Sequence, residues 1–401
     1  MKIRSPETYW LLKNGLTNSY PSLKEDLECD ILVVGGGITG ALMAFQLSGE
    51  GYNVVLIDKN DVCLGSTSAT TAILQYELDE QLQDLIQKVG EEAAVTTYKA
   101  GVVMINWLNE LVHHLHFDCG FEMKNSVYFS RNEEDQISLR REFECRARYG
   151  FGVEWLSGPQ LLKHYGVAGT GAIVSDKAAC VDAYALTHKL LHHAVINSGL
   201  RVYDHTSLAE VRTEEKGAVV FTDGDYKISC KNVVYATGYE SEQFLHQPVA
   251  KLVSTYAFVS EPLKVVPPAL YTSVFWDTGV PYFYMRTTTD GRLLIGGADE
   301  DFQDSVLRDT LIDRKEQELL DLFRVTMPDM SITPDFSWAG TFGITKDSMP
   351  YIGRHPENEH SYFVLGYGGN GITFSLMAMK MISDSIAGKE NRFNEYFKFD
   401  R

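Results

Sequence analysis

Apolar and glycine-rich blocks alternate near the start of the chain. Residues 31–34 form an apolar run rich in β-branched side chains, typical of a strand buried on both faces of a parallel sheet. Residues 41–47 have helical composition, and residues 54–57 form a second apolar run. This order predicts a strand–helix–strand unit, the repeating element of parallel sheets.

Three glycines between the first strand and the helix suggest a ligand for this unit. Gly35, Gly37 and Gly40 have GxGxxG spacing, and Asp58 follows Gly40 by 18 residues. We expect a tight turn at Gly35, close backbone approach to a pyrophosphate at Gly37, and close helix–strand packing at Gly40. Amide groups at the helix start would bind the phosphates. Asp58 would accept hydrogen bonds from the adenosine ribose, and its charge disfavours NADP. FAD and NAD both remain open.

Residues 65–72, GSTSATTA, form a hydroxyl-rich segment after this unit. Short hydroxyl side chains suit a segment that runs along phosphate and ribitol oxygens. A capping or turn segment would have the same composition. We favour ligand contact because the segment follows the predicted dinucleotide unit.

The rest of the pattern predicts further helices and strands. Helices are expected over residues 79–117 (with a break near Gly90), 133–149, 182–199, 309–323 and 374–386. Strands are expected over residues 127–129, 201–203, 218–222, 232–236 and 362–366. Alternation over residues 251–300, with a turn at 289–291, predicts an antiparallel sheet.

A second glycine loop, YGGNGIT at residues 367–373, lies between the last predicted strand and the last helix. Its glycine spacing differs from GxGxxG, and no second acid-terminated unit follows. We therefore predict one dinucleotide site, with its reactive end near residues 369–373. The helix dipole there would stabilise a flat redox ring that becomes anionic on reduction.

Length and composition narrow the class of protein. The 401 residues suffice for two domains, and 20 Phe, 21 Tyr and 5 Trp leave room for a flat, buried ligand. The net charge of −18 argues against nucleic acid or an anionic membrane as a partner. Six cysteines without a CxxC motif suggest reduced thiols, and no run approaches the ~18 apolar residues of a membrane span. We expect a soluble cytoplasmic protein without an integral membrane segment.

A histidine-rich stretch does not change this picture. His113, His114 and His116 lie near the end of a predicted helix, and no two of them have i, i+4 spacing. We interpret them as helix-end residues and predict no metal site.

Together these motifs resemble the FAD-dependent oxidoreductases of the D-amino-acid oxidase and glycine oxidase superfamily. The branch of sarcosine oxidase and gamma-glutamylputrescine oxidase is the most similar. The resemblance spans almost the whole chain and rests on Tyr9–Trp10, YPSLKED (20–26), GGGITG (35–40), VDAYAL (181–186), VVYATG (233–238), WAGTFGITKDSMPYIGR (338–354) and GYGGNGI (366–372).

The resemblance implies the fold and the cofactor. We expect an α/β protein (α+β overall) with a Rossmann-like FAD-binding domain around a parallel sheet, and a substrate domain with a large antiparallel sheet. The implied FAD-binding domain comprises residues 1–78, 150–248 and 335–401, and the substrate-binding domain comprises residues 79–149 and 249–334. FAD replaces NAD as the expected cofactor, and the implied chemistry is oxidation of a C–N bond.

The resemblance also implies the residues that bind FAD, although each has an alternative role in packing. They are Gly35, Gly37, Ile38, Thr39, Gly40, Asp58, Lys59, Thr67, Ser68, Thr71, Leu208, Gly238, Gly340, Gly369, Asn370, Gly371, Ile372 and Thr373.

The chain departs from the family pattern at Phe342. Amino-acid-oxidising members have a carboxylate-binding arginine at this place, and sarcosine oxidase-like members have a cysteine that attaches FAD. We therefore expect non-covalent FAD and no usual carboxylate clamp. Arg286 could contact a substrate anion instead, or could be an exposed strand residue. Tyr256, Tyr282, Tyr284 and Phe342 are candidates for the pocket walls, or for ordinary sheet core.

The implied reaction is hydride transfer from the carbon beside a neutral amine to flavin N5. The imine would then hydrolyse, and oxygen would reoxidise the flavin. This chemistry needs orientation and a dry face rather than an acid–base triad, so we assign no catalytic residue. A dehydrogenase that reduces a quinone or carrier protein, a non-catalytic flavin-binding protein and an NAD-dependent dehydrogenase are the alternatives. No motif encodes the particular amine or amino-acid-like substrate.

Overall fold

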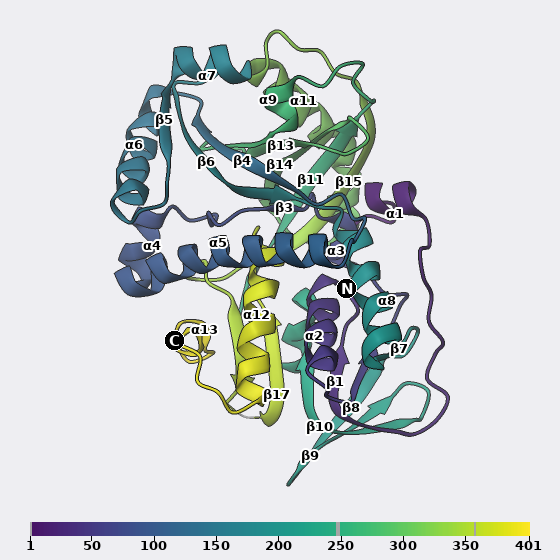
Figure 1. Ribbon diagram of the computed structural model, residues 1–401. Helices are drawn as coiled ribbons and strands as arrows, with labels where there is room; N and C mark the ends of the chain where they lie inside the picture. Colours follow the sequence, from purple (N-terminus) through teal and green to yellow (C-terminus); the bar gives the residue numbers. More distant parts are fainter. Residues whose placement is uncertain (1, 246–248, 357) are drawn as a thin grey trace. The chain divides into compact units, whose positions relative to one another are not determined.

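The computed structural model describes residues 2–245, 249–356 and 358–401 (Figure 1). The chain divides into two compact units, each built from three segments. One, here called the antiparallel-sheet unit, comprises Met1–Leu12, Ala69–Asp182 and Leu252–Phe342. The other, the parallel-sheet unit, comprises Lys13–Ser68, Ala183–Lys251 and Gly343–Arg401.

An eight-stranded sheet forms the centre of the parallel-sheet unit, with the strand order β16-β17-β10-β1-β2-β7. Five of its strands are joined in parallel: β17 (Asn358–Leu365), β10 (Lys227–Tyr235), β1 (Leu27–Val34), β2 (Val54–Ile57) and β7 (Arg201–Tyr203). Three others pair in antiparallel fashion: β16 (Tyr351–His355), β9 (Gly217–Thr222) and β8 (Leu208–Glu214).

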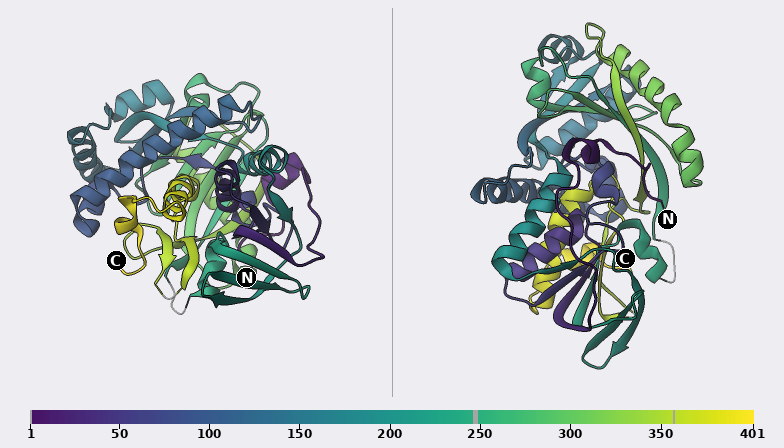
Figure 2. Two further views of the ribbon diagram at one scale, coloured as in Figure 1. Left: turned by 60° about the horizontal axis from the view of Figure 1, so that its bottom comes forward. Right: turned by 90° about the vertical axis from the view of Figure 1, so that its right-hand side faces the viewer.

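Three helices lie side by side on one face of this sheet: α12 (Gly371–Ile386), α2 (Ile38–Gly49) and α8 (Ala183–Ser198) (Figure 2). The four residues 31–34 are all buried, as expected for a strand covered on both faces. Leu32 and Val34 pack in a core cluster with Val55 and Val233 of the neighbouring strands. The first apolar run therefore fixes the middle of the sheet.

A nine-stranded sheet forms the centre of the antiparallel-sheet unit, with the order β15-β11-β14-β13-β12-β4-β6-β3, and β5 pairs with β6. In chain order the strands are β3 (Ile73–Leu74), β4 (Glu122–Ser130), β5 (Glu154–Ser157), β6 (Gly171–Cys180), β11 (Lys251–Ser260), β12 (Ser273–Asp277), β13 (Phe283–Thr287), β14 (Leu293–Asp301) and β15 (Pro334–Ile344). All the recorded pairings are antiparallel except β12 with β4.

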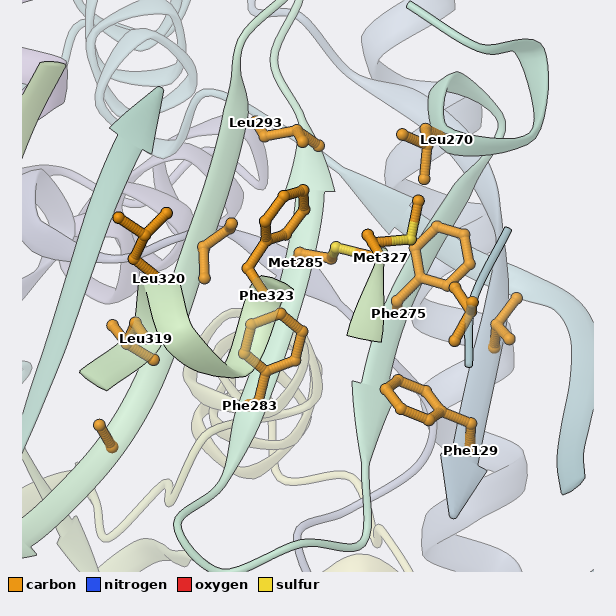
Figure 3. Close-up of a cluster of buried hydrophobic side chains, with 14 of the residues drawn as sticks. Phe129, Leu270, Phe275, Phe283, Met285, Leu293, Leu319, Leu320, Phe323 and Met327 are labelled. Carbon is orange, nitrogen blue, oxygen red and sulfur yellow. The ribbon is translucent and has the colours of Figure 1, made fainter. Parts of the chain in front are cut away.

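Alternation along these strands separates two faces: one faces a large hydrophobic core, and the other carries polar side chains and a smaller, largely aromatic cluster. Phe283 and Met285 of β13 point into a core of large apolar side chains (Figure 3). That core is completed by helices α7 (Gly158–Tyr165), α9 (Pro268–Tyr271) and α11 (Ile312–Thr326). Tyr284 and Arg286 alternate with the two core residues, so they belong to the opposite face, here called the polar face.

The remaining elements are short or lie outside the two sheets. They are α1 (Tyr9–Asn14), α3 (Ser66–Ala69), α4 (Leu82–Val89), α5 (Glu91–His114), α6 (Glu133–Arg148), the 3-10 helix η1 (Gly238–Phe244), α10 (Ser305–Thr310) and α13 (Phe393–Phe397). No helix among the described residues is both long and apolar enough to cross a membrane.

The mixed α/β fold with a parallel and a large antiparallel sheet confirms the predicted fold class. The edges of the compact units differ from the predicted domain limits, for example at residues 150–182, which lie in the antiparallel-sheet unit. The reason is that β6 pairs with β4 from Gly171 to Cys180. The assignment of FAD binding and substrate binding to separate domains stays a prediction.

Candidate cofactor and substrate sites

The first glycine loop has the close contacts that its spacing predicts. Gly35 has a φ of +106°, and a Cβ atom there would lie 2.5 Å from the carbonyl oxygen of Ala236. A Cβ atom at Gly40 would lie 1.8 Å from the carbonyl oxygen of Gly35. Both contacts exclude any side chain, so β1, the loop and α2 approach as closely as a dinucleotide fold requires.

The start of α2 is fixed by two side chains. Asp58 Oδ2 accepts a hydrogen bond from Gly36 N at 2.6 Å, and Thr67 Oγ1 accepts one from Ile38 N at 2.9 Å. Asp58 Oδ1 also accepts from Asn60 N at 2.9 Å. Burial raises the pKa of Asp58 to about 6, although both backbone bonds oppose the shift. Asp58 therefore supports the first glycine loop, and its hydrogen bond to the adenosine ribose stays a prediction.

Asp204 is a neighbouring acid that the sequence analysis missed. It is completely buried and accepts hydrogen bonds from Tyr20 N at 2.8 Å and Val62 N at 2.9 Å. Its charge contributes to the raised pKa of Asp58. Each acid directly follows a strand of the parallel sheet, β2 or β7, and parallel strands end at one edge. The place of an acid directly after a parallel strand is the sequence signal that could have identified Asp204.

The closing glycine loop contacts the first one within the parallel-sheet unit. Thr39 Oγ1 of α2 lies 2.7 Å from Ser375 Oγ of α12 and 3.3 Å from the hydroxyl of Tyr367. The Tyr367 hydroxyl donates to the Val364 carbonyl oxygen at 2.7 Å. These bonds hold the first turns of two helices together, with Gly371 opening α12. Two positive dipole ends are thus placed at one site.

Other predicted cofactor residues occupy varied positions in the parallel-sheet unit. Gly238 follows β10 with a φ of +57°, and Leu208 opens β8 opposite Thr222. Ser68 is fully buried and donates to the Gly65 carbonyl oxygen at 3.0 Å. Lys59 pairs with Glu240 at 2.5 Å.

The predicted cofactor residues of the closing loop are mostly buried. Asn370, Ile372 and Thr373 are buried, and Gly369 precedes them.

Two predicted cofactor residues, Thr71 and Gly340, lie in the antiparallel-sheet unit. Thr71 Oγ1 lies 3.4 Å from the Tyr284 hydroxyl. A Cβ atom at Gly340 would make only ordinary contacts, 3.7 Å from Thr255 and 3.8 Å from Ala69. Packing within this unit therefore does not require a glycine at position 340.

The polar face brings together two of the predicted pocket residues. The rings of Tyr282 and Tyr284 have centroids 5.5 Å apart, and both side chains are partly exposed. A Cβ atom at Gly296 would lie 2.3 Å from the Tyr284 hydroxyl, so this glycine lets the Tyr284 ring lie across β14. Phe342 is also partly exposed.

Tyr256 is not brought together with that pair. It is 2% exposed and packs in the hydrophobic core with Phe258 and Phe323. The reason is the strand register: Tyr256 pairs with Gly297, which pairs with the core residue Phe283, so all three positions belong to the core face of the sheet.

Arg286 is buried rather than exposed, so its interpretation as an exposed strand residue is wrong. It is 3% exposed, and its guanidinium donates to the Val181 carbonyl oxygen at 3.1 Å. The guanidinium carbon also lies 5.3 Å from the centroid of the Trp10 ring. Its Nε is buried, and no hydrogen bond to it is recorded within the described residues. An anion contact at Arg286 stays a prediction.

These features fit a dinucleotide. The glycine cradle excludes side chains, and two helix N-termini supply amide groups beside it, as a pyrophosphate and an electron-rich ring require. The fold and the loops together define the class of dinucleotide-binding oxidoreductases.

A family model described as FAD dependent oxidoreductase (DAO) matches residues 30–385. The chain belongs to this family, so it is an FAD-dependent oxidoreductase, and the predicted superfamily and cofactor are confirmed.

Several relatives cover most of the chain. A glycine oxidase of Geobacillus kaustophilus is 25% identical over 376 residues, covering 91% of this chain and 94% of the relative. Gamma-glutamylputrescine oxidoreductase of Escherichia coli is 25% identical, with 94% and 88% covered. YhfW of Bacillus subtilis, which carries the name of a Rieske 2Fe-2S iron–sulfur protein, is 26% identical, with 98% and 75% covered.

The fold is shared with solved structures. The crystal structure of the Geobacillus kaustophilus glycine oxidase has a TM-score of 0.81 at 22% identity, covering 94% of this chain and 99% of that chain. This likeness confirms the predicted fold.

Proposed function

We propose that the protein oxidises the C–N bond of a small amine or amino-acid-like substrate, with oxygen as the electron acceptor. The names of two relatives, a glycine oxidase and a gamma-glutamylputrescine oxidoreductase, support this class of substrate. The observation that carries the proposal is the pair of partly exposed rings, Tyr282 and Tyr284, on the polar face of the antiparallel sheet. Aromatic faces hold a small amine and exclude water from it.

The residues of the glycine loops would hold the cofactor. Gly35, Gly37 and Gly40 would approach the pyrophosphate, and Asp58 would stand beside the adenosine ribose. The residues from Gly369 to Thr373 would surround the flavin ring. The chemistry that bound FAD supplies is the acceptance of two electrons from a carbon–hydrogen bond. Phe342 has no nucleophile, so we propose that FAD is bound non-covalently.

The substrate side of the reaction is balanced without an acid–base triad. The C–H hydrogen leaves as a hydride that carries both electrons, the N–H bond gives one proton to solvent, and a C=N bond forms. Water then hydrolyses the imine to a carbonyl compound and an amine. The chain's contribution is to orient a neutral amine on a dry face, so Tyr282 and Tyr284 are proposed as substrate-binding residues. Tyr256 would act only through the core beneath them.

Oxygen consumption by the purified holoenzyme tests this proposal. With a substrate amine, we expect stoichiometric loss of oxygen and formation of peroxide. Amine turnover that reduces an added dye while oxygen stays constant would refute oxygen as the acceptor.

A dehydrogenase that reduces a carrier protein is the second candidate. The relative named for a Rieske iron–sulfur protein favours it, because such a cluster accepts single electrons. Reduction of a one-electron acceptor faster than of oxygen would support this reading.

A further inference from the structure

The polar face carries an acid that the proposed reaction does not use. We propose that Asp299 binds a second, protonated amine of the substrate, so that the preferred substrate is a diamine or polyamine. This inference rests on the proposed amine oxidation and specifies its substrate class.

A β-bulge places Asp299 on the polar face. Gly296 pairs with Tyr284 and Gly297 with Phe283, so strict alternation would direct residue 299 into the hydrophobic core. Instead Ala298 has a φ of +51° and is completely buried in the core cluster. One extra residue thus reverses the alternation, and Asp299 comes to lie on the side of Tyr284.

The carboxylate of Asp299 has an unsatisfied oxygen. Its Oδ1 is buried, and no hydrogen-bond partner to this atom is found within the described part of the chain. The side chain of Thr255 hydrogen-bonds to the carboxyl group, and burial raises its pKa to about 6. A buried carboxylate oxygen without a donor is costly, and a ligand that supplies an N–H donor would remove that cost.

The neighbours of Asp299 suit a cation. The charge of Asp79 raises the pKa of Asp299 and of the Tyr282 and Tyr284 hydroxyls, so a second carboxylate acts on the same three groups. Two acids and two electron-rich rings attract an ammonium group, whereas a substrate carboxylate would be repelled.

Lys315, the cation whose charge lowers the pKa of Asp299, is engaged elsewhere: it pairs with Glu300 at 2.8 Å and Glu318 at 3.0 Å. No ion pair to Asp299 is recorded among the described residues. An external cation therefore accounts for the arrangement.

A diamine matches both requirements of the site. The amine that is oxidised must be neutral, because a protonated nitrogen has no lone pair to form the C=N bond. A second amine of the same molecule stays protonated near neutral pH and pairs with Asp299. The methylene groups between the two nitrogens would contact the tyrosine rings.

Matched probes test this inference on the holoenzyme. N-methylputrescine and N-methylbutylamine share a four-carbon chain and differ in the terminal amino group. We expect kcat/KM to favour the diamine, and Asp299→Asn to lower it about 10- to 100-fold for the diamine while changing the monoamine little. Asp301→Asn, an exposed residue of the same strand, is the matched control and should change neither value.

An equilibrium readout separates this inference from the proposed function. Calorimetric titration of N-methylputrescine into holoenzyme whose flavin has first been reduced with dithionite, under anaerobic conditions, should give binding that Asp299→Asn weakens by a similar factor. Equal losses for both amines, or no loss for either, would overturn the Asp299 site. Preference for N-methyl-γ-aminobutyrate, lost in Arg286→Ala, would also overturn it. Diamine binding through Asp299 without flavin reduction would contradict the proposed reaction but not the cation site.

Discussion

At the scale of single residues, close contacts decide which residues of the cofactor site can be replaced without a steric clash. Gly40 has no room for a side chain, because a Cβ atom would lie 1.8 Å from the Gly35 carbonyl oxygen. Gly49, at the end of the same helix, has no heavy atom within 4 Å of the corresponding position. The two glycines are therefore a matched pair.

Gly40→Ala should yield protein with little bound FAD, because the first glycine loop must move away from α2 to relieve the clash. Gly49→Ala should keep the wild-type flavin content and be slightly more stable, since alanine favours a helix. The ratio of visible flavin absorbance to protein absorbance after purification measures both. Equal flavin content in the two variants would contradict the proposed cradle.

Asp58 provides a residue-scale prediction of pH dependence. Its pKa in the folded protein is about 6, which is above the value of about 3.9 for an unfolded chain. Its contribution to stability is therefore fully present below about pH 4 and is lost as the pH rises through about 6. Asp58→Asn keeps the shape of the side chain but does not titrate, so its unfolding free energy lacks this pH dependence.

We expect the unfolding free energy of apoprotein, relative to Asp58→Asn, to fall by about 1–2 kcal/mol between pH 4.5 and pH 7. This range is below the full value implied by the pKa difference, because Asp58 is only partly buried. Urea denaturation at several pH values measures it. A difference between the two proteins that does not change with pH would show that Asp58 is not desolvated.

At the scale of elements, hydrophobic periodicity predicted most helices and strands. The break near Gly90 separates α4 from α5, and residues 182–199 bracket α8. The predicted boundaries were less accurate than the elements themselves. Helix α12 begins at Gly371 rather than Phe374. The helix predicted at residues 309–323 is α11 at Ile312–Thr326, preceded by α10. Helix starts depend on loop geometry that periodicity does not encode.

The parts that the sequence could not predict depend on long-range register. The core position of Tyr256 follows from its pairing with Gly297, opposite Phe283. The position of Asp299 on the polar face follows from one extra residue of β14 in its pairing with β11. The contact between Thr39 and Ser375 joins residues 336 positions apart. Local patterns identified both glycine loops but not the side chains that connect them.

The link between α2 and α12 gives a prediction at this scale. Tyr367→Phe removes a buried hydroxyl that donates to the Val364 carbonyl oxygen and lies beside Thr39. We expect unfolding to become easier by about 1–2 kcal/mol and FAD to bind several-fold more weakly. Tyr226→Phe, in the hairpin between β9 and β10, is the control. Unchanged FAD affinity in Tyr367→Phe would mean that the two helix starts hold the cofactor independently.

At the scale of the whole molecule, family membership establishes the cofactor and the class of enzyme, while the substrate is a proposal. The sequence resemblance predicts that Phe342 stands where similar proteins carry a carboxylate-binding arginine or an FAD-attaching cysteine, and we propose Asp299 as a cation-binding acid on the polar face. Both proposals favour an amine without a carboxylate beside the reacting carbon. The fold is therefore shared with amino-acid oxidases, and the proposed substrate differs.

Anaerobic reduction of the bound flavin tests the central claim most directly. Purified holoenzyme would be mixed, without oxygen, with N-methylputrescine, N-methylbutylamine and glycine in separate experiments. Our account predicts that the diamine bleaches the visible flavin absorbance at the lowest concentration and that added oxygen restores it. If dithionite bleaches the flavin and none of these amines or related polyamines does, the protein does not oxidise amines and the proposed function is wrong.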